Sequence, residues 1–84
     1  MEKIQPLREE LYKIDKEIIR LLEKRLDKVG EIRRIKKKMY IPLRDTKRET
    51  ERIEALKKDS KLSPKLIEVL YQMIFEENER IHGK

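Results

Sequence analysis

One apolar stripe runs through residues 6–39, PLREELYKIDKEIIRLLEKRLDKVGEIRRIKKKM. Counting Ile4 just before this segment, its members recur at intervals of three and four residues: Ile4, Leu7, Leu11, Ile14, Ile18 and Leu21, then Ile32, Ile35 and Met39. This spacing predicts one long amphipathic helix from about Pro6 to Met39. Such a helix is about 50 Å long, whereas a compact globule of this chain length has a radius of about 12 Å. Much of the stripe is therefore expected to pack against another chain.

A second, shorter helix is expected after a loop around Pro42. Pro42 lacks an amide donor and disfavours helical angles at the residue before it, so the long helix cannot continue through this position. Asp45 or Thr46 can cap the second helix, and Thr46 with Glu49 three residues later matches a capping box. The helix then runs to about Lys58.

The third helix has clear signals at its start. Ser63 is placed as the N-cap, Pro64 occupies the first helical position, and the helix is expected to end near His82. No strand pattern competes with these segments. We therefore predict an all-α fold with three helices per chain, a long first helix and a single domain over residues 1–84.

The composition limits what else this chain can be. With 84 residues and no cysteine, it is marginal in size and lacks disulfides and thiolate metal sites, so a partner chain is the expected source of extra stability. No apolar run is long enough for a membrane span and no signal peptide is visible, which favours a cytoplasmic protein. Abundant Lys and Glu with scarce Asn and Gln are typical of proteins from hot environments.

The net charge of +6 is concentrated in one segment. Residues 24–38 hold eight Lys or Arg and two acids, which accounts for the whole excess. Such a run is either a solvated face or a site for something anionic.

Within this segment, cations interrupt the apolar stripe. Arg25 and Lys28 occupy positions where the repeat predicts apolar residues. Arg25 and Lys36 point in nearly the same direction and lie about 16 Å apart along the helix axis, which leaves a gap of ligand size between them. They could instead be rim residues of a dimer seam whose charged ends reach solvent.

Polar residues also extend the inner faces of the other two helices. On the third helix, Asn78 and then His82 continue an apolar face at a spacing of four residues. Glu49 lies on the inward edge of the second helix, where a carboxylate needs a partner. His82 could also be a surface or capping group, and Glu49 could belong to the capping box. Arg8 lies about 25 Å from Arg25 along the helix, so it could reach the same pocket only across a dimer.

The chain offers no residues for covalent or metal-dependent catalysis. It has no cysteine and one histidine, so neither a nucleophile with an adjacent base nor a zinc or di-metal site is expected.

Several short segments together resemble the all-helical chorismate mutases over essentially the whole chain. These segments are Leu7-Arg8 with Ile14-Asp15, the cations Arg25 and Lys36, residues 42–49 with the sequence PLRDTKRE, and residues 71–76 with the sequence YQMIFE. The resemblance implies an intertwined homodimer with two shared active sites. It also implies the rearrangement of chorismate to prephenate in phenylalanine and tyrosine biosynthesis, without cofactor or metal.

The resemblance assigns the cations to the substrate's charged groups. It implies that Arg8 from the partner chain and Arg25 hold the carboxylates of chorismate, and that Lys36 bridges a carboxylate and the ether oxygen. Negative charge grows on that oxygen as the C–O bond breaks, and preorganised donors stabilise it.

The remaining site residues complete this expectation. The resemblance implies that Asp45 and Glu49 fix the ring hydroxyl, that Arg48 supports the site and that Asn78 lines it. His82 stands where the family usually has Gln or Glu, as the second donor to the ether oxygen. Imidazole keeps at least one N–H in either charge state, so a donor is still expected there.

Three other functions remain open at this level. An isochorismate pyruvate lyase uses a similar cationic helical pocket. A nucleic-acid binder using residues 24–38 is favoured by the sequence pI of about 9.6, but the cations alternate with a core stripe and no exposed aromatics are expected. A coiled-coil dimerisation module would have apolar residues at positions 25 and 28.

Overall fold

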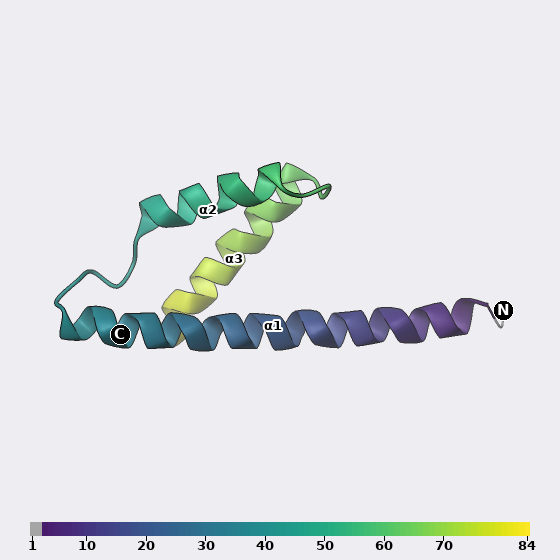
Figure 1. The fold of residues 1–84 in the computed structure, drawn as a ribbon, viewed down its shortest axis with the longest axis horizontal. Coiled ribbons are helices and arrows are strands. Elements are labelled where there is room, and N and C mark those ends of the chain that lie inside the picture. The colour runs from purple at the N-terminus through teal and green to yellow at the C-terminus, as the bar shows by residue number, and fades with distance from the viewer. Residues whose placement is uncertain (1–2) are drawn as a thin grey trace.

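The computed structural model describes residues 3–84 and contains three α-helices. They are α1 (Ile4–Lys38), α2 (Thr46–Lys58) and α3 (Pro64–His82), with no strand among the described residues (Figure 1). The predicted all-helical class with a long first helix is confirmed. Helix α1 begins two residues before the expected Pro6, because proline is tolerated in a first turn, where its missing amide would have no partner.

The end of α1 is a tight left-handed turn. Tyr40 has a φ of 56°, and the amide of Ile41 donates to the carbonyl of Lys36 at 2.9 Å. This bond pattern closes the helix end by using carbonyls that have no partner within the helix. The chain then turns into the loop that leads to α2.

The two later helices begin at side-chain caps. The carboxylate of Asp45 accepts from the amide of Arg48 at 3.0 Å, so Asp45, not Thr46, caps α2. The predicted capping box of Thr46 and Glu49 is wrong, because the Glu49 carboxylate is bound by Arg44 instead. The cap of α3 is as predicted: Ser63 Oγ accepts from the amide of Leu66 at 3.1 Å.

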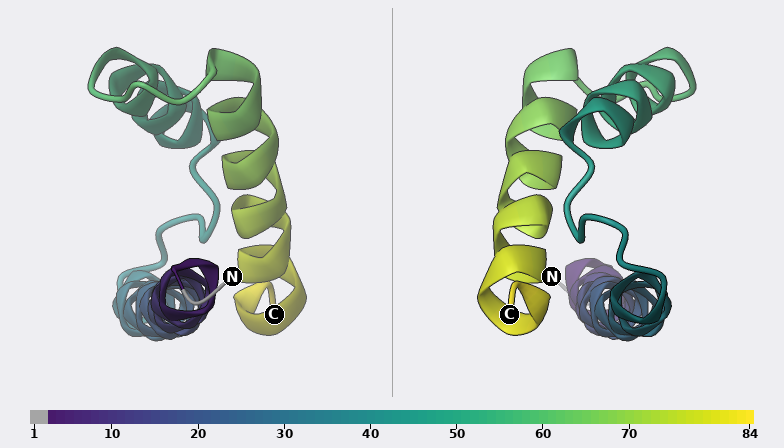
Figure 2. Two further views of the ribbon diagram at one scale, coloured as in Figure 1. Left: turned by 90° about the vertical axis from the view of Figure 1, so that its right-hand side faces the viewer. Right: turned by 90° about the vertical axis from the view of Figure 1, so that its left-hand side faces the viewer.

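Helix α3 connects the other two helices. It starts against α2, diverges from it and crosses the C-terminal half of α1, while the N-terminal half of α1 projects without a neighbour from the described residues (Figures 1 and 2). The molecule therefore measures 58 × 24 × 18 Å. None of its helices over residues 3–84 combines the length and apolar character needed to cross a membrane.

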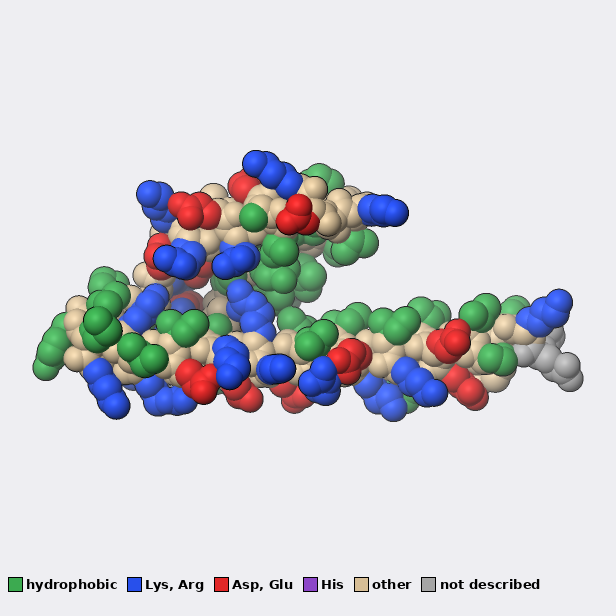
Figure 3. All heavy atoms as spheres, in the orientation of Figure 1, with side chains coloured by type: hydrophobic (Ala, Val, Ile, Leu, Met, Phe, Trp, Pro, Cys, Tyr) green, Lys and Arg blue, Asp and Glu red, His purple; other side chains and the backbone are tan. Residues whose placement is uncertain are grey.

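The apolar core of the single chain is small. The buried apolar residues among those described are Ile53, Ile67 and Phe75. By contrast, the N-terminal stripe of α1 is 47–60% exposed along its whole length and forms a continuous apolar edge (Figure 3). Its members are Ile4, Leu7, Leu11, Ile14, Ile18 and Leu21. The exposed large apolar side chains among the described residues thus outnumber the buried ones. They include Tyr12 and Tyr40, so the expectation that exposed aromatics are lacking is wrong.

Candidate active site

A cavity of about 240 Å³ lies where the three helices approach one another. Five of the sequence-predicted site residues line it, and they come from all three helices and the loop: Arg25, Lys36, Asp45, Glu49 and Asn78. Arg48 lines it as well. We call it the cationic cavity.

Arg25 forms part of the cavity wall on α1. Its guanidinium carbon lies 5.7 Å from the ring centroids of both Tyr71 and Phe75, which are favourable neighbours for a cation. Its Nη1 atom is buried and has no hydrogen-bond partner among the described residues. A buried donor without an acceptor is costly, so this atom is suited to an anion that enters the cavity.

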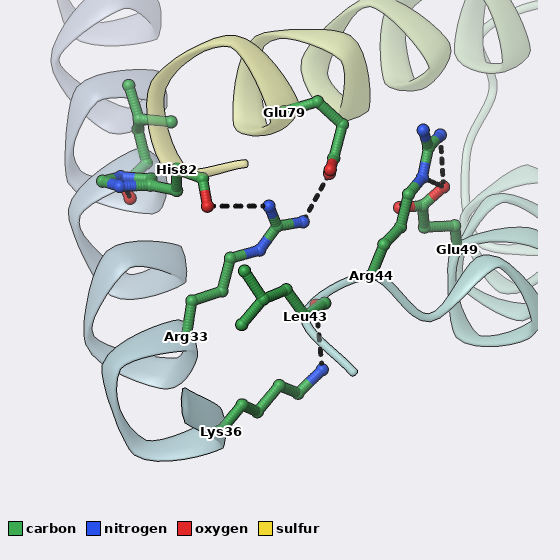
Figure 4. A network of polar contacts seen from close by, with 8 residues as sticks. Arg33, Lys36, Leu43, Arg44, Glu49, Glu79 and His82 are labelled. Atoms are coloured by element: carbon green, nitrogen blue, oxygen red, sulfur yellow. Dashed lines mark hydrogen bonds and ion pairs between the residues drawn. The ribbon is translucent and has the colours of Figure 1, made fainter. Parts of the chain in front are cut away.

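Lys36 connects α1 to the loop before α2. Its Nζ donates to the carbonyl of Leu43 at 3.3 Å (Figure 4). An ammonium group has three donors, so this single bond leaves others for a ligand. The side chain is half-buried beside the cavity, where electrostatic interactions are stronger than in open solvent.

The two carboxylates of the site are held by cations and backbone donors. Arg44 donates to the Glu49 carboxylate through Nε and Nη2 at 3.1–3.3 Å, and the Glu49 side chain is 17% exposed (Figure 4). The backbone hydrogen bond from Arg48 lowers the pKa of Asp45, with help from the charges of Arg48 and Lys36. An ionised Asp45 only accepts hydrogen bonds, which suits a ligand hydroxyl.

Positive charge dominates the cavity lining. Arg33 and Arg52, which the interruptions of the apolar stripe do not predict, line the cavity together with Arg25, Lys36 and Arg48. Five cations and two carboxylates line the cavity. Although Glu79 pairs with Arg33, cations remain in excess, so the cavity favours anions. Arg33 precedes Lys36 by one helical turn and Arg52 follows Arg48 by one turn, and this spacing is the signal that could have identified them.

His82 lies outside the cationic cavity, contrary to expectation. Its Nε2 is 2.9 Å from the carbonyl of Leu26, and its ring packs over Gly30. A Cβ at Gly30 would stand 2.7 Å from the ring atom Cε1, so only glycine leaves room for the imidazole there. Within a single chain, His82 therefore does not face the cavity with Arg25 and Lys36, because the gap at Gly30 holds its ring on another side of α1.

Arg8 also lies apart from the cavity. It sits on the projecting half of α1, beside the side chains of Gln5, Glu9 and Tyr12 from the same helix. Within one chain, the structure thus brings together every predicted site residue except Arg8 and His82. No group of three or more His, Asp or Glu over residues 3–84 is arranged to hold a metal ion.

Comparison with known proteins agrees with this architecture. The family model described as chorismate mutase type II matches residues 7–83, almost the entire chain. No curated protein and no solved structure was found to match. Because the match spans all three helices and every residue of the cationic cavity, this chain belongs to the chorismate mutase type II family, whose enzymes isomerise chorismate to prephenate.

Proposed function

We propose that two copies of this chain form an intertwined homodimer in which two shared active sites convert chorismate into prephenate. The observation that carries this proposal is the buried Nη1 of Arg25, which has no hydrogen-bond partner among residues 3–84, in a cavity lined by more cations than carboxylates. Chorismate is a dianion, and one of its carboxylates would give this atom the acceptor it lacks. The proposal places the enzyme in phenylalanine and tyrosine biosynthesis in the cytoplasm.

The reaction needs positioning and electrostatics from the protein. Arg25 binds a carboxylate, and Lys36 bridges a carboxylate and the ether oxygen, whose negative charge grows as its C–O bond breaks. Because these donors are fixed before the reaction starts, they stabilise the transition state more than the substrate. The ring hydroxyl donates its one hydrogen bond to the carboxylate of Asp45 or Glu49, and the two carboxylates together fix its position and orient the ring. No cofactor takes part.

Asn78 is the better candidate for the second donor to the ether oxygen. Its side chain is 5% exposed and lines the cavity, whereas the imidazole of His82 is bound at Leu26. An amide can donate through either of its two N–H groups. We therefore assign to Asn78 the role that the resemblance gave to His82.

The exposed stripe of α1 supports the dimer. An apolar groove next to the cationic cavity is lined by Ile19, Leu22, Leu70 and Met73, among others, and shares Arg25 and Asn78 with the cavity. The projecting half of a partner's α1 would cover this groove with its own apolar stripe and bury both surfaces. This arrangement would bring Arg8 of the partner to the cavity.

A direct assay tests the activity. The purified chain is mixed with chorismate, and both the loss of the substrate's ring absorbance and the formation of prephenate are followed. A parallel reaction with isochorismate, monitored for pyruvate, distinguishes the related lyase. We expect the parent to form prephenate and Arg25→Ala to lose this activity. If the chain releases pyruvate from isochorismate but forms no prephenate, the lyase replaces the proposed function.

A further inference from the structure

Arg33 is a buried cation with no part in the reaction as described so far. It is 6% exposed and lines the cationic cavity one helical turn before Lys36. Removing a guanidinium from water is costly unless other groups compensate its charge and its donors. The partners of Arg33 therefore indicate what it does.

Both partners of Arg33 belong to the last turn of α3, residues 79–82. Its Nη2 pairs with the Glu79 carboxylate, and its Nη1 donates to the backbone carbonyl of His82 at 3.2 Å (Figure 4). The last carbonyls of a helix have no partner within it and carry partial negative charge. One guanidinium from α1 thus binds a side chain and the backbone at the end of α3.

A second contact holds the same turn on α1. The ring of His82 fills the space above Gly30, and its Nε2 lies 2.9 Å from the carbonyl of Leu26. With Arg33, this contact fixes the last turn of α3 at two points along α1. Asn78 directly precedes this turn and is 5% exposed in the cavity wall. The position of Asn78 relative to Arg25 therefore depends on both contacts.

We propose that Arg33 is a positioning residue which, together with Glu79, holds the last turn of α3 so that Asn78 faces the reacting ether oxygen. The inference rests on the proposed function. Arg33 acts through α3 and not on the substrate, because Nη1 and Nη2 both bind α3 and Glu79 balances its charge. The two contacts of His82 make it part of the same clamp.

Removal of Arg33 should affect turnover more than substrate binding. Arg25 and Lys36 hold the substrate carboxylates, and neither forms a hydrogen bond or ion pair with Arg33. A displacement of about 1 Å in a donor to the transition state can cost up to about 100-fold in rate. We expect Arg33→Met to lower kcat about tenfold or more while KM stays within about threefold.

The matched control is Arg34→Met. It removes the same charge from the neighbouring position of α1, but Arg34 is exposed and does not line the cavity, so kcat should stay at the parent's value. A double-mutant cycle with Glu79→Met adds a second arm. Because the pair acts as a unit, Arg33→Met with Glu79→Met should lower kcat no more than Arg33→Met alone.

Two results would overturn the proposal. One is a parental kcat in Arg33→Met, and the other is a raised KM with kcat preserved, which would mean that Arg33 binds substrate directly. If Arg33→Met does not fold, Glu79→Gln keeps an uncharged and weaker acceptor for Arg33, so a smaller fall in kcat with KM retained is expected. Parental kinetics in that variant would equally overturn the proposal.

Amide hydrogen exchange without substrate separates this inference from the proposed function. In Arg33→Met, the amides of residues 78–82 should exchange faster than in the parent and in Arg34→Met, because the clamp has lost one contact. Unchanged exchange would overturn the clamp whatever the activity. If the amides of residues 78–82 exchange faster in Arg33→Met than in the parent, but the parent does not convert chorismate, the clamp stands and the proposed function is overturned instead.

Discussion

The guanidinium of Arg25 packs against two aromatic rings and forms no ion pair with a carboxylate of the described residues. Tyr71 and Phe75 both lie 5.7 Å from its guanidinium carbon, and its buried Nη1 has no partner among the described residues. Such an arrangement contributes less to stability than a paired cation because one donor is left unsatisfied. The free donor can bind an anionic substrate, so its removal is expected to lower activity while it raises the free energy of unfolding.

Arg25→Met should abolish most activity without destabilising the fold. The loss of a donor to the substrate is expected to lower kcat/KM about 100-fold or more. The lost cation–π contacts cost about 1 kcal/mol, but the unsatisfied donor, worth about 1–3 kcal/mol, disappears as well. The free energy of unfolding in urea should therefore rise by about 1 kcal/mol. A loss of stability that parallels the loss of activity would show that Arg25 is a structural residue.

A comparison of Lys36 with its neighbour Lys37 separates the effect of a positive charge at the cavity from the effect of a positive charge elsewhere on α1. Lys36 bonds to Leu43 at the cavity, while Lys37 donates to the carbonyl of Lys84 away from it. Lys36→Ala should lower kcat/KM roughly 100-fold or more, in the range of a lost oxyanion donor. Lys37→Ala should leave it nearly unchanged. Equal losses in steady-state assays of the two variants would indicate a diffuse effect of positive charge.

A substitution at the end of α1 should stabilise the fold, because tyrosine is unfavourable in the left-handed backbone conformation of residue 40. A φ of 56° is a region where glycine is preferred, and the Tyr40 side chain is 95% exposed, so its removal loses almost no packing. Tyr40→Gly should raise the free energy of unfolding by about 0.5–1 kcal/mol. Tyr40→Val should lower it, since β-branched residues disfavour positive φ. Urea unfolding at one fixed protein concentration measures both, and a more stable Val variant would contradict this account.

The docking of α3 on α1 should weaken in acid. The hydrogen bond from Arg33 lowers the pKa of Glu79, and the charges of Arg33 and Arg44 add to this effect. A lowered pKa in the folded state means that the stabilisation is present above the unfolded value, near pH 4, and is lost as the pH falls through the folded value. The thermal midpoint of the parent should exceed that of Glu79→Gln at pH 7, and the difference between the two midpoints should shrink as the pH falls below about 4. If the difference between the two thermal midpoints does not change as the pH falls, the ion pair between Arg33 and Glu79 does not stabilise the fold.

The sequence predicts the elements better than the contacts between them. Periodicity and caps identify all three helices because they depend on residues within one turn of each other, as Ser63 and Pro64 show. The choice of Asp45 over Thr46 as cap was left open because Glu49 could bind either the backbone or Arg44. The position of the His82 ring in a single chain does not follow from the spacing on α3, because the gap at Gly30 that holds it belongs to α1. The burial of Arg33 does not follow from the sequence, because it depends on how α3 crosses α1.

At the scale of the whole molecule, the chain is too extended to cover its own apolar surface. It is 58 Å long, and the stripe on the projecting half of α1 has no neighbour among residues 3–84. In the proposed homodimer the same half-helix has two tasks: it covers the partner's apolar groove and carries Arg8 to the partner's cavity. Folding, association and completion of the active site would then be one event.

Complementation between inactive variants tests this shared site. In a dimer with two-fold symmetry, a chain with Arg8→Ala paired with a chain with Lys36→Ala has one site with both defects and one site with none. Random mixing makes about half of the dimers mixed, so about a quarter of the parent's activity should return when two nearly inactive proteins are unfolded and refolded together.

The control is a mixture of Arg25→Ala with Lys36→Ala. These two residues line the same cavity of one chain, so every site in the mixed dimer keeps one defect and no activity should return. Recovery in the first mixture but not in the second would assign Arg8 to the partner's site. If neither mixture recovers although mixed dimers are detected by mass, Arg8 does not act across the interface. The projecting half of α1 would then serve association alone, because Arg8 lies about 25 Å from Arg25 of its own chain along the helix axis and cannot reach that cavity.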